Sequence, residues 1–269
     1  MSASPLLALK KVGKTYKARD REVTALEDIS FEVADRDFLT IVGPSGCGKS
    51  TLLNLVAGLE SATTGSIEFL GQPVTKAGDR RIGYVTQQDN LFPWRQLLDN
   101  VALPLELAGM GKAERRDRAR HWIEKFGLAG FEKAYPHELS GGMRQRANIA
   151  RTLIYEPRLV MMDEPFGPLD AQTRLQLQSE LLRIWSETGT SVLFITHDLA
   201  EAIALSQRVV VMSARPGRFE VVRDVTLAEP RNIARIHDDP GFRTAYDELW
   251  DKLEDVVQRG TPQQGRPSA

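Results

Sequence analysis

Residues 38–59 read FLTIVGPSGCGKSTLLNLVAGL, which is a short apolar run, a glycine-rich loop and a helical stretch in direct succession. The run 38–42 shows no polar alternation, as is typical of a strand buried on both faces of a parallel sheet. Residues 43–50 fit the pattern G-x-x-x-x-G-K-[ST] of a phosphate-binding loop. Because a strand precedes this loop and a helix is predicted over 51–59, the pattern has the context that it needs. We therefore expect an α/β fold with a phosphate site at the start of this helix.

Each residue type in the loop suits a nucleotide's phosphates. Glycines let the backbone wrap an anion with inward N–H groups, and the following helix turns its positive end toward the same anion. Lys49 is expected to reach the β- and γ-phosphates, Ser50 to give its hydroxyl to Mg²⁺, and Thr51 to hydrogen-bond the α-phosphate. The residues predicted to bind the nucleotide here are Gly43, Pro44, Ser45, Gly46, Cys47, Gly48, Lys49, Ser50 and Thr51.

Cys47, the one cysteine of the chain, lies inside this loop, and two interpretations of it are open. In the first, a small residue simply fills a variable position. In the second, Lys49 and the helix terminus make its thiolate accessible, so alkylation should block nucleotide binding and ATP should protect.

A second apolar run, 159–162, ends in two acidic residues. Carboxylates at the carboxyl edge of a parallel sheet point into the crevice where ligands bind. Asp163 is therefore expected to hold the hydration shell of Mg²⁺, and Glu164 to polarise an attacking water as a general base. The alternative is that these two residues are surface acids at the end of a strand with no role in a site. The presence of a phosphate loop in the same chain makes this alternative less favoured.

Other apolar segments predict the rest of the fold. Unbroken runs at 192–195 and 209–212 favour further buried parallel strands, whereas alternating runs at 29–33 and 67–69 are typical of half-exposed antiparallel strands. Helical patterns occur at 112–126, at 170–187 and from about 240 to 257. The basic residues of the first of these helices favour a solvated face over a nucleic-acid site, because no aromatic residues interleave them.

The composition predicts a soluble globular protein. The chain has 269 residues, with 35 Lys and Arg against 36 Asp and Glu. This balance argues against a basic nucleic-acid coat, and a single cysteine excludes an internal disulfide framework. We expect no secretory signal and no membrane span, since no run approaches the ~20 apolar residues that a span needs.

Residues 139–146, LSGGMRQR, predict a second anion site. Ser140 is a good N-cap, and two glycines at a helix start leave N–H groups free. This segment resembles the signature motif of ATP-binding cassette (ABC) ATPases. The resemblance implies that Ser140, Gly141 and Gly142 contact the γ-phosphate held by the phosphate loop of a second copy of the chain.

Further motifs of that family follow in order, and the resemblance covers about residues 6–213. Tyr16 lies where the family stacks an aromatic ring on adenine, although packing on the core is an alternative for it. Gln87 matches the glutamine that senses Mg²⁺ and the γ-phosphate. We prefer it to its neighbour Gln88 because it lies six positions before Pro93.

Two more segments complete the family's motif set. Residues 166–170 match the D-loop and imply a nucleotide contact for Asp170, although Pro168 stands where a small residue is commoner. His197 matches the switch histidine on the γ-phosphate. The resemblance thus implies catalytic roles for Glu164, His197 and Gln87, and Mg²⁺ contacts for Ser50, Gln87 and Asp163.

The resemblance also implies an architecture. We expect an ABC ATPase domain over 1–213, which has a RecA-like core, an antiparallel β subdomain and a helical subdomain at about 91–155. A short extension with one helix, 214–260, and a disordered tail, 261–269, should follow. A head-to-tail dimer is expected to close on two ATP molecules, with each chain supplying half of each site.

Two segments, LFPWR at 91–95 and MSARPGR at 212–218, look like the ATPases of the nitrate/sulfonate/taurine importer group. The expected function is ATP hydrolysis that drives uptake of a small solute through separate permease subunits. A substrate-binding protein is an indirect partner, nucleic acid is not one, and the location is peripheral, on the cytoplasmic face of the inner membrane. An ATPase of an exporter or lipoprotein-release complex is the alternative. A soluble ABC protein of DNA repair or translation would need a second cassette or a coiled-coil insertion.

Overall fold

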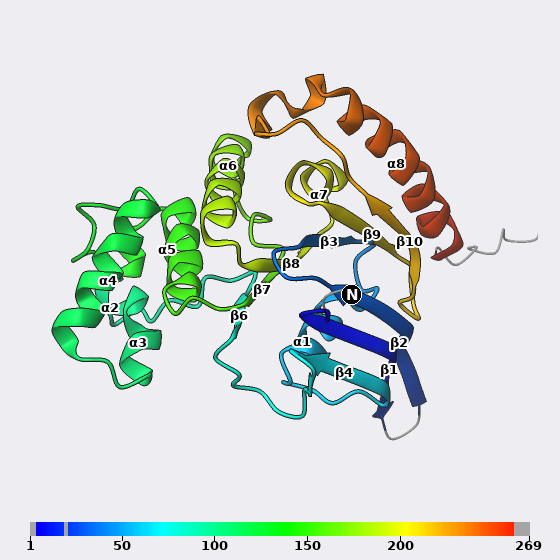
Figure 1. Ribbon diagram of the computed structural model, residues 1–269, viewed down its shortest axis with the longest axis horizontal. Helices are drawn as coiled ribbons and strands as arrows, with labels where there is room; N and C mark the ends of the chain where they lie inside the picture. Colours follow the sequence, from blue (N-terminus) through cyan, green and yellow to red (C-terminus); the bar gives the residue numbers. More distant parts are fainter. Residues whose placement is uncertain (1–3, 19–20, 261–269) are drawn as a thin grey trace, which may run out of the picture.

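A six-stranded sheet in the order β10-β9-β3-β8-β7-β6 lies at the centre of the computed structural model, which describes residues 4–18 and 21–260 (Figure 1). Its strands are β3 (Phe38–Val42), β6 (Ile82–Val85), β7 (Leu159–Asp163), β8 (Ser191–Thr196), β9 (Arg208–Met212) and β10 (Phe219–Asp224). Neighbouring strands pair in parallel except β10, which is antiparallel to β9. Every residue of β3 and β8 is buried, which confirms the parallel strands expected from unbroken apolar runs.

A four-stranded antiparallel sheet, in the order β2-β1-β4-β5, lies beside the core sheet. Its strands are β1 (Leu7–Ala18), β2 (Arg21–Val33), β4 (Thr64–Phe69) and β5 (Gln72–Pro73). The two alternating segments expected to be antiparallel strands fall within β2 and β4, and this prediction is confirmed. Helix α1 (Lys49–Val56) lies between the two sheets in Figure 1.

Successive residues of the core strands point to opposite faces of the sheet, as a period of two requires. Leu39, Leu159 and Leu193 pack with α1 and the antiparallel sheet in one hydrophobic cluster. Phe38 and Val160 pack with the helices on the other face. The core sheet is thus covered on both sides, which explains why its strands are apolar throughout.

Helices make up every described element between residues 91 and 155, and they project to one side of the core sheet (green in Figure 1). They are α2 (Leu97–Val101), α3 (Leu103–Leu107), α4 (Lys112–Lys125), η1 (Pro136–Glu138) and α5 (Gly141–Leu153). Helices α6 (Ala171–Thr188) and α7 (Leu199–Leu205) pack on the face of the core sheet opposite α1. Asp170 caps the start of α6 and Gly189, at φ 63°, its end.

The segment after residue 213 adds to the core. Strand β10 extends the sheet, a pairing that the sequence pattern did not predict, and η2 (Ile233–Asp238) and α8 (Pro240–Gly260) follow. Helix α8 packs on the core through buried residues such as Phe242 and Leu249. The tail predicted over 261–269 lies outside the described residues.

Helix α1 begins and ends earlier than predicted, at Lys49 and Val56 instead of 51 and 59. It begins directly after Gly48, whose φ is 105°, and it cannot continue through Gly58, whose φ is 68°. Among the helices of residues 4–18 and 21–260, none combines the length and the apolar character needed to cross a bilayer.

Candidate functional site

The loop between β3 and α1 holds a buried lysine. Lys49 is 6% exposed, and its ammonium donates hydrogen bonds to the carbonyl oxygens of Gly43 (2.8 Å) and Pro44 (3.1 Å). These carbonyls compensate the burial of the charge. The positive group is therefore held inside the curve of the loop, beside the first turn of α1.

Gly48 is required by the close approach of this loop to β2. Its φ of +105° is rarely adopted by other residues, and a Cβ there would lie 2.7 Å from Leu26 Cδ2 and 3.0 Å from the Ala25 carbonyl. A side chain at residue 48 would push the loop away from β2.

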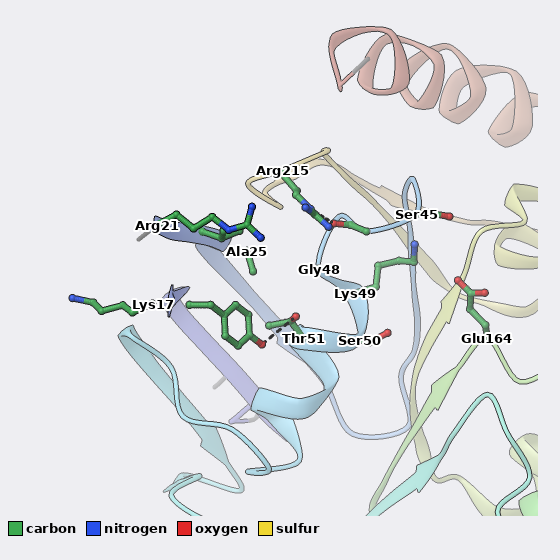
Figure 2. Close-up of a pocket in the computed structure, with 13 residues that line it drawn as sticks. Lys17, Arg21, Ala25, Ser45, Gly48, Lys49, Ser50, Thr51, Glu164 and Arg215 are labelled. Atoms are coloured by element: carbon green, nitrogen blue, oxygen red, sulfur yellow. Dashed lines mark hydrogen bonds between the residues drawn. The ribbon is translucent and has the colours of Figure 1, made fainter. Parts of the chain in front are cut away.

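A cavity of about 590 Å³ opens over this loop (Figure 2). We call it the phosphate-loop cavity. The residues predicted for nucleotide binding or catalysis that line it are Tyr16, Ser45, Gly46, Gly48, Lys49, Ser50, Thr51 and Glu164. The fold thus brings together side chains from β1, the loop, α1 and the end of β7.

Tyr16 forms a wall of the cavity. Its ring is 38% exposed, and its hydroxyl donates a 2.7 Å hydrogen bond to Glu60 and lies 3.5 Å from the Thr51 hydroxyl. In the register of β1 and β2 it stands opposite Val23, which lines the same cavity. The ring therefore borders the cavity and is not packed in the core, the alternative considered from the sequence.

Asp163 and Ser50, two of the three residues expected to serve Mg²⁺, meet at the end of β7. Burial raises the pKa of Asp163, and the charge of Glu164 adds to this, while a hydrogen bond with Ser50 and the charge of Lys49 lower the pKa. A carboxylate beside a hydroxyl is an all-oxygen donor set, which is the set that Mg²⁺ prefers. These residues fit the cation.

Glu164 and His197 are brought together by the register of two neighbouring strands. Asp163 of β7 pairs with Ile195 of β8, so the residues that follow each strand emerge side by side. His197 Nδ1 lies 3.1 Å from Glu164 Oε2, and the Glu164 N–H donates to the Ile195 carbonyl at 2.9 Å. Glu164 has a φ of 44°, a strained conformation of the kind that occurs at functional sites.

Gln87 follows β6 and approaches the same strand ends. A Cβ added to Gly167 would lie 3.9 Å from Gln87 Nε2 and 4.0 Å from the Glu164 Cβ. The Gln87 side chain and Glu164 therefore both lie beside the same glycine. Gln87 and Gln88 both line a second cavity, of about 670 Å³, together with Gly141 and Pro168. This second cavity shares no lining residue with the phosphate-loop cavity.

The signature segment lies away from the phosphate loop of its own chain. The Ser140 hydroxyl accepts a hydrogen bond from the Met143 N–H at 3.3 Å and caps α5. A Cβ on Gly142 would lie 2.5 Å from Thr173 Cγ2, so α5 packs directly on α6. None of the residues Ser140, Gly141, Gly142 and Asp170 lines the phosphate-loop cavity.

Cys47 is 1% exposed, and burial raises the pKa of its thiol although the charge of Lys49 opposes this rise. The thiol is therefore protonated and covered, and the interpretation as an accessible thiolate is wrong. The physical reason is that the side chain points into the core between the loop and the sheet, where Lys49 approaches only to 3.9 Å.

Several residues of the cavity were not predicted. Arg21, Val23 and Ala25 line it from one face of β2, and their spacing of two residues was a signal that could have found them. Lys17 and Arg215 also line it. Arg215 lies in the segment 212–218, whose sequence resembles the importer group and predicts no nucleotide contact.

The chain is similar to known proteins over most of its length. A family model described as ABC transporter matches residues 26–167. The chain is 49% identical, over 86% of either length, to an uncharacterized ABC transporter ATP-binding protein of Methanocaldococcus jannaschii. It is 45% identical to the aliphatic sulfonates import ATP-binding protein SsuB of Bacillus cereus, over 82% of this chain and 86% of the relative.

Solved structures are similar as well. The dimeric structure of MJ0796, a bacterial ABC transporter cassette, superposes with a TM-score of 0.74 at 34% identity and covers 82% of this chain and 99% of that one. A dimer of the same cassette in a post-hydrolysis state with ADP and Pi superposes with a TM-score of 0.73 at 33% identity.

Proposed function

The chain belongs to the ABC transporter family of ATPases, and from this premise we propose that it energises the import of a small solute through separate permease subunits. The observation that carries the ATPase assignment is that Lys49 and Glu164 line one cavity, while His197 lies 3.1 Å from Glu164 at the end of the neighbouring strand. Its similarity to SsuB, whose name describes import of aliphatic sulfonates, supports the direction of transport.

In this proposal the cavity holds ATP. The adenine stacks on the Tyr16 ring, the N–H groups of the loop and of α1 surround the phosphates, and Lys49 exchanges its carbonyl partners for phosphate oxygens. Ser50, Asp163 and Gln87 would hold Mg²⁺, which when bound neutralises negative charge on the phosphates.

Glu164 acts as the general base. Its carboxylate faces the cavity at the strand end, where it can accept a proton from a water aligned with the γ-phosphate. With both ring nitrogens carrying a proton, the imidazole of His197 would donate its Nδ1–H to Glu164 and its Nε2–H to an oxygen of the γ-phosphate. The strained backbone of Glu164 serves to aim the carboxylate.

Two copies of the chain complete each site. The signature residues Ser140, Gly141 and Gly142 lie outside their own phosphate-loop cavity, so we infer that they serve the γ-phosphate of the second copy, with Asp170 at the same interface. The dimeric cassettes similar to this chain support that arrangement. ATP bound to both faces favours the closed dimer, and loss of the γ-phosphate lets it open.

The permease is proposed to dock beside Trp94. This side chain is 70% exposed and stacks on Phe92 with ring centroids 5.0 Å apart. The loop is rigid, because the fully buried Asn100 accepts a hydrogen bond from the Phe92 N–H and donates to the carbonyls of Phe92 and Arg95. An exposed aromatic on a rigid loop is a good anchor for a partner. The ATPase would then lie at the cytoplasmic face of the inner membrane.

Trp94→Ala tests this function in a transporter reconstituted with its permease and binding protein. Basal ATP hydrolysis should persist, while stimulation by the assembled transporter and solute uptake should fall at least about 10-fold, because a central aromatic anchor contributes about 2 kcal/mol or more. Trp250→Ala is the matched control, since Trp250 is 48% exposed on α8. Normal uptake by Trp94→Ala, or ATP-driven efflux by the intact transporter, would contradict the proposal.

A further inference from the structure

The turn between β9 and β10, residues 213–218, is fastened to β2. The Gly217 N–H donates to the Ala25 carbonyl at 2.8 Å, and the Gly217 carbonyl accepts from the Glu27 N–H at 3.0 Å. Within the turn, the Ser213 hydroxyl donates to the Pro216 carbonyl at 3.0 Å. We call this segment the Arg215 turn, and its bonds hold it in one place beside the phosphate loop.

The same turn contacts the phosphate loop itself. Arg215 Nε donates a 3.0 Å hydrogen bond to the Gly46 carbonyl. A Cβ on Gly217 would lie 2.1 Å from the Cys47 carbonyl, so only glycine permits this approach. The guanidinium of Arg215 is thereby held at the edge of the loop that surrounds the phosphates.

Most of the hydrogen-bonding capacity of Arg215 faces the cavity. The side chain is exposed and lines the phosphate-loop cavity, and within residues 4–18 and 21–260 its terminal nitrogens have neither an ion pair nor a hydrogen bond. Arg218 in the same turn is different, because it pairs with Glu27 at 2.7 Å and does not line the cavity. In Figure 2 the guanidinium of Arg21, which also lines the cavity, is turned toward that of Arg215.

We propose that Arg215 is a nucleotide-binding residue whose guanidinium contacts the phosphate chain of ATP. The planar group is anchored through Nε and presents its two terminal nitrogens, an arrangement suited to a bidentate contact with phosphate oxygens. The inference rests on the nucleotide site of the proposed function and adds to it a residue outside the motifs that identify the site.

Isothermal titration of the purified chain with MgADP and with the non-hydrolysable analogue AMPPNP tests this contact. Arg215→Ala should raise Kd about 10-fold or more, since a charge-assisted contact to phosphate is worth about that factor. Arg218→Ala, the matched control, should stay within about twofold of the wild type. Kd should also depend less steeply on KCl concentration in Arg215→Ala, because one screened charge contact is gone.

Two results would overturn the inference. One is a Kd for Arg215→Ala within about twofold of the wild type. The other is a weakened Kd with an unchanged salt dependence, which would mean that Arg215 only positions the loop through Gly46. If Arg215→Ala does not fold, Arg215→Gln removes the charge and retains a donor, and it is judged by the same two measurements. Failure of the wild-type chain to bind either nucleotide would instead contradict the nucleotide site itself.

Discussion

Two successive carboxylates at the end of β7 lie in different surroundings. Asp163 is partly buried against Ser50, whereas Glu164 turns into the cavity at a φ of 44° and pairs with His197. Residues that are neighbours in sequence thus face different parts of one site. In the proposed function, this separation lets Asp163 serve the cation and Glu164 serve the attacking water.

Glu164→Gln should lower the rate of ATP hydrolysis by about 10²–10⁴-fold, because the amide cannot accept the proton of the attacking water. Binding of ATP should persist, since the loop and Lys49 are intact. Phosphate release by the purified chain measures the first effect, and equilibrium titration measures the second. Glu187→Gln on α6, where the carboxylate pairs with Lys125 and Arg183, is the control. Hydrolysis at the wild-type rate would exclude Glu164 as the base.

Asp163→Asn should stabilise the nucleotide-free chain at pH 7. Folding raises the pKa of Asp163. At a pH above this raised pKa the ionised carboxylate therefore destabilises the folded chain, and at a pH below the ordinary pKa of aspartate this destabilisation is absent. The gain in free energy of unfolding should therefore shrink as the pH falls toward about 4. Urea denaturation at the two pH values measures it.

Asp170→Asn is the control for this prediction, with the opposite sign. Hydrogen bonds from Thr173 lower the pKa of Asp170, so its carboxylate stabilises the folded chain above its ordinary pKa. Asp170→Asn should not increase the free energy of unfolding at pH 7. A gain for Asp163→Asn that persists unchanged at low pH would mean that charge is not the cause.

The residues of the site differ in how far the sequence predicted them. Glu164 and His197 directly follow β7 and β8, and Lys49 begins the helix after the loop that follows β3, so chain order places all three at one sheet edge. The burial of Cys47 depends on β2 and the Arg215 turn packing against the loop, and no local pattern records that contact. The same holds for the position of Arg215.

At the scale of elements, burial decides which strands the sequence reveals. Strands β3, β7, β8 and β9 lie between two covered faces and have unbroken apolar runs. Strand β10 is an edge strand whose residues alternate between half-buried and exposed and end in Arg223 and Asp224, so its pattern resembles a loop. Strand β10 joins the sheet through backbone hydrogen bonds to β9, and the periodicity of the sequence does not reveal this pairing.

Helix α8 is expected to be required for the stability of the core. Leu249 is 1% exposed within the main hydrophobic cluster, so Leu249→Ala should lower the free energy of unfolding by about 2–5 kcal/mol. Lys252→Ala, at an exposed position of the same helix, should change it by about 0.5 kcal/mol or less. Urea denaturation of the two variants makes the comparison. Equal free energies of unfolding for Leu249→Ala and Lys252→Ala would mean that the packing of α8 does not stabilise the core.

At the scale of the whole molecule, the phosphate loop and the signature segment of one chain lie on separate surfaces and do not contribute to one cavity. The phosphate-loop cavity and the cavity that Gly141 lines share no residue, although α5 is packed tightly on α6. The sequence alone predicts an anion site in each half, and only the resemblance to ABC ATPases indicates that the two halves of one site come from different copies. The tight packing explains the separation, since no local rearrangement would move Ser140 to its own phosphate loop.

Ser140→Arg in a Glu164→Gln background tests this composite site. A bulky cation at the start of α5 should block closure onto the second copy's nucleotide, so the ATP-dependent dimer should be lost. ATP binding should stay within about twofold, because Ser140 is remote from its own cavity. Light scattering with and without MgATP measures the mass, and Ser186→Arg on the exposed face of α6 is the control. If Ser140→Arg still doubled its mass with ATP, the signature segment could not be the surface that closes each site.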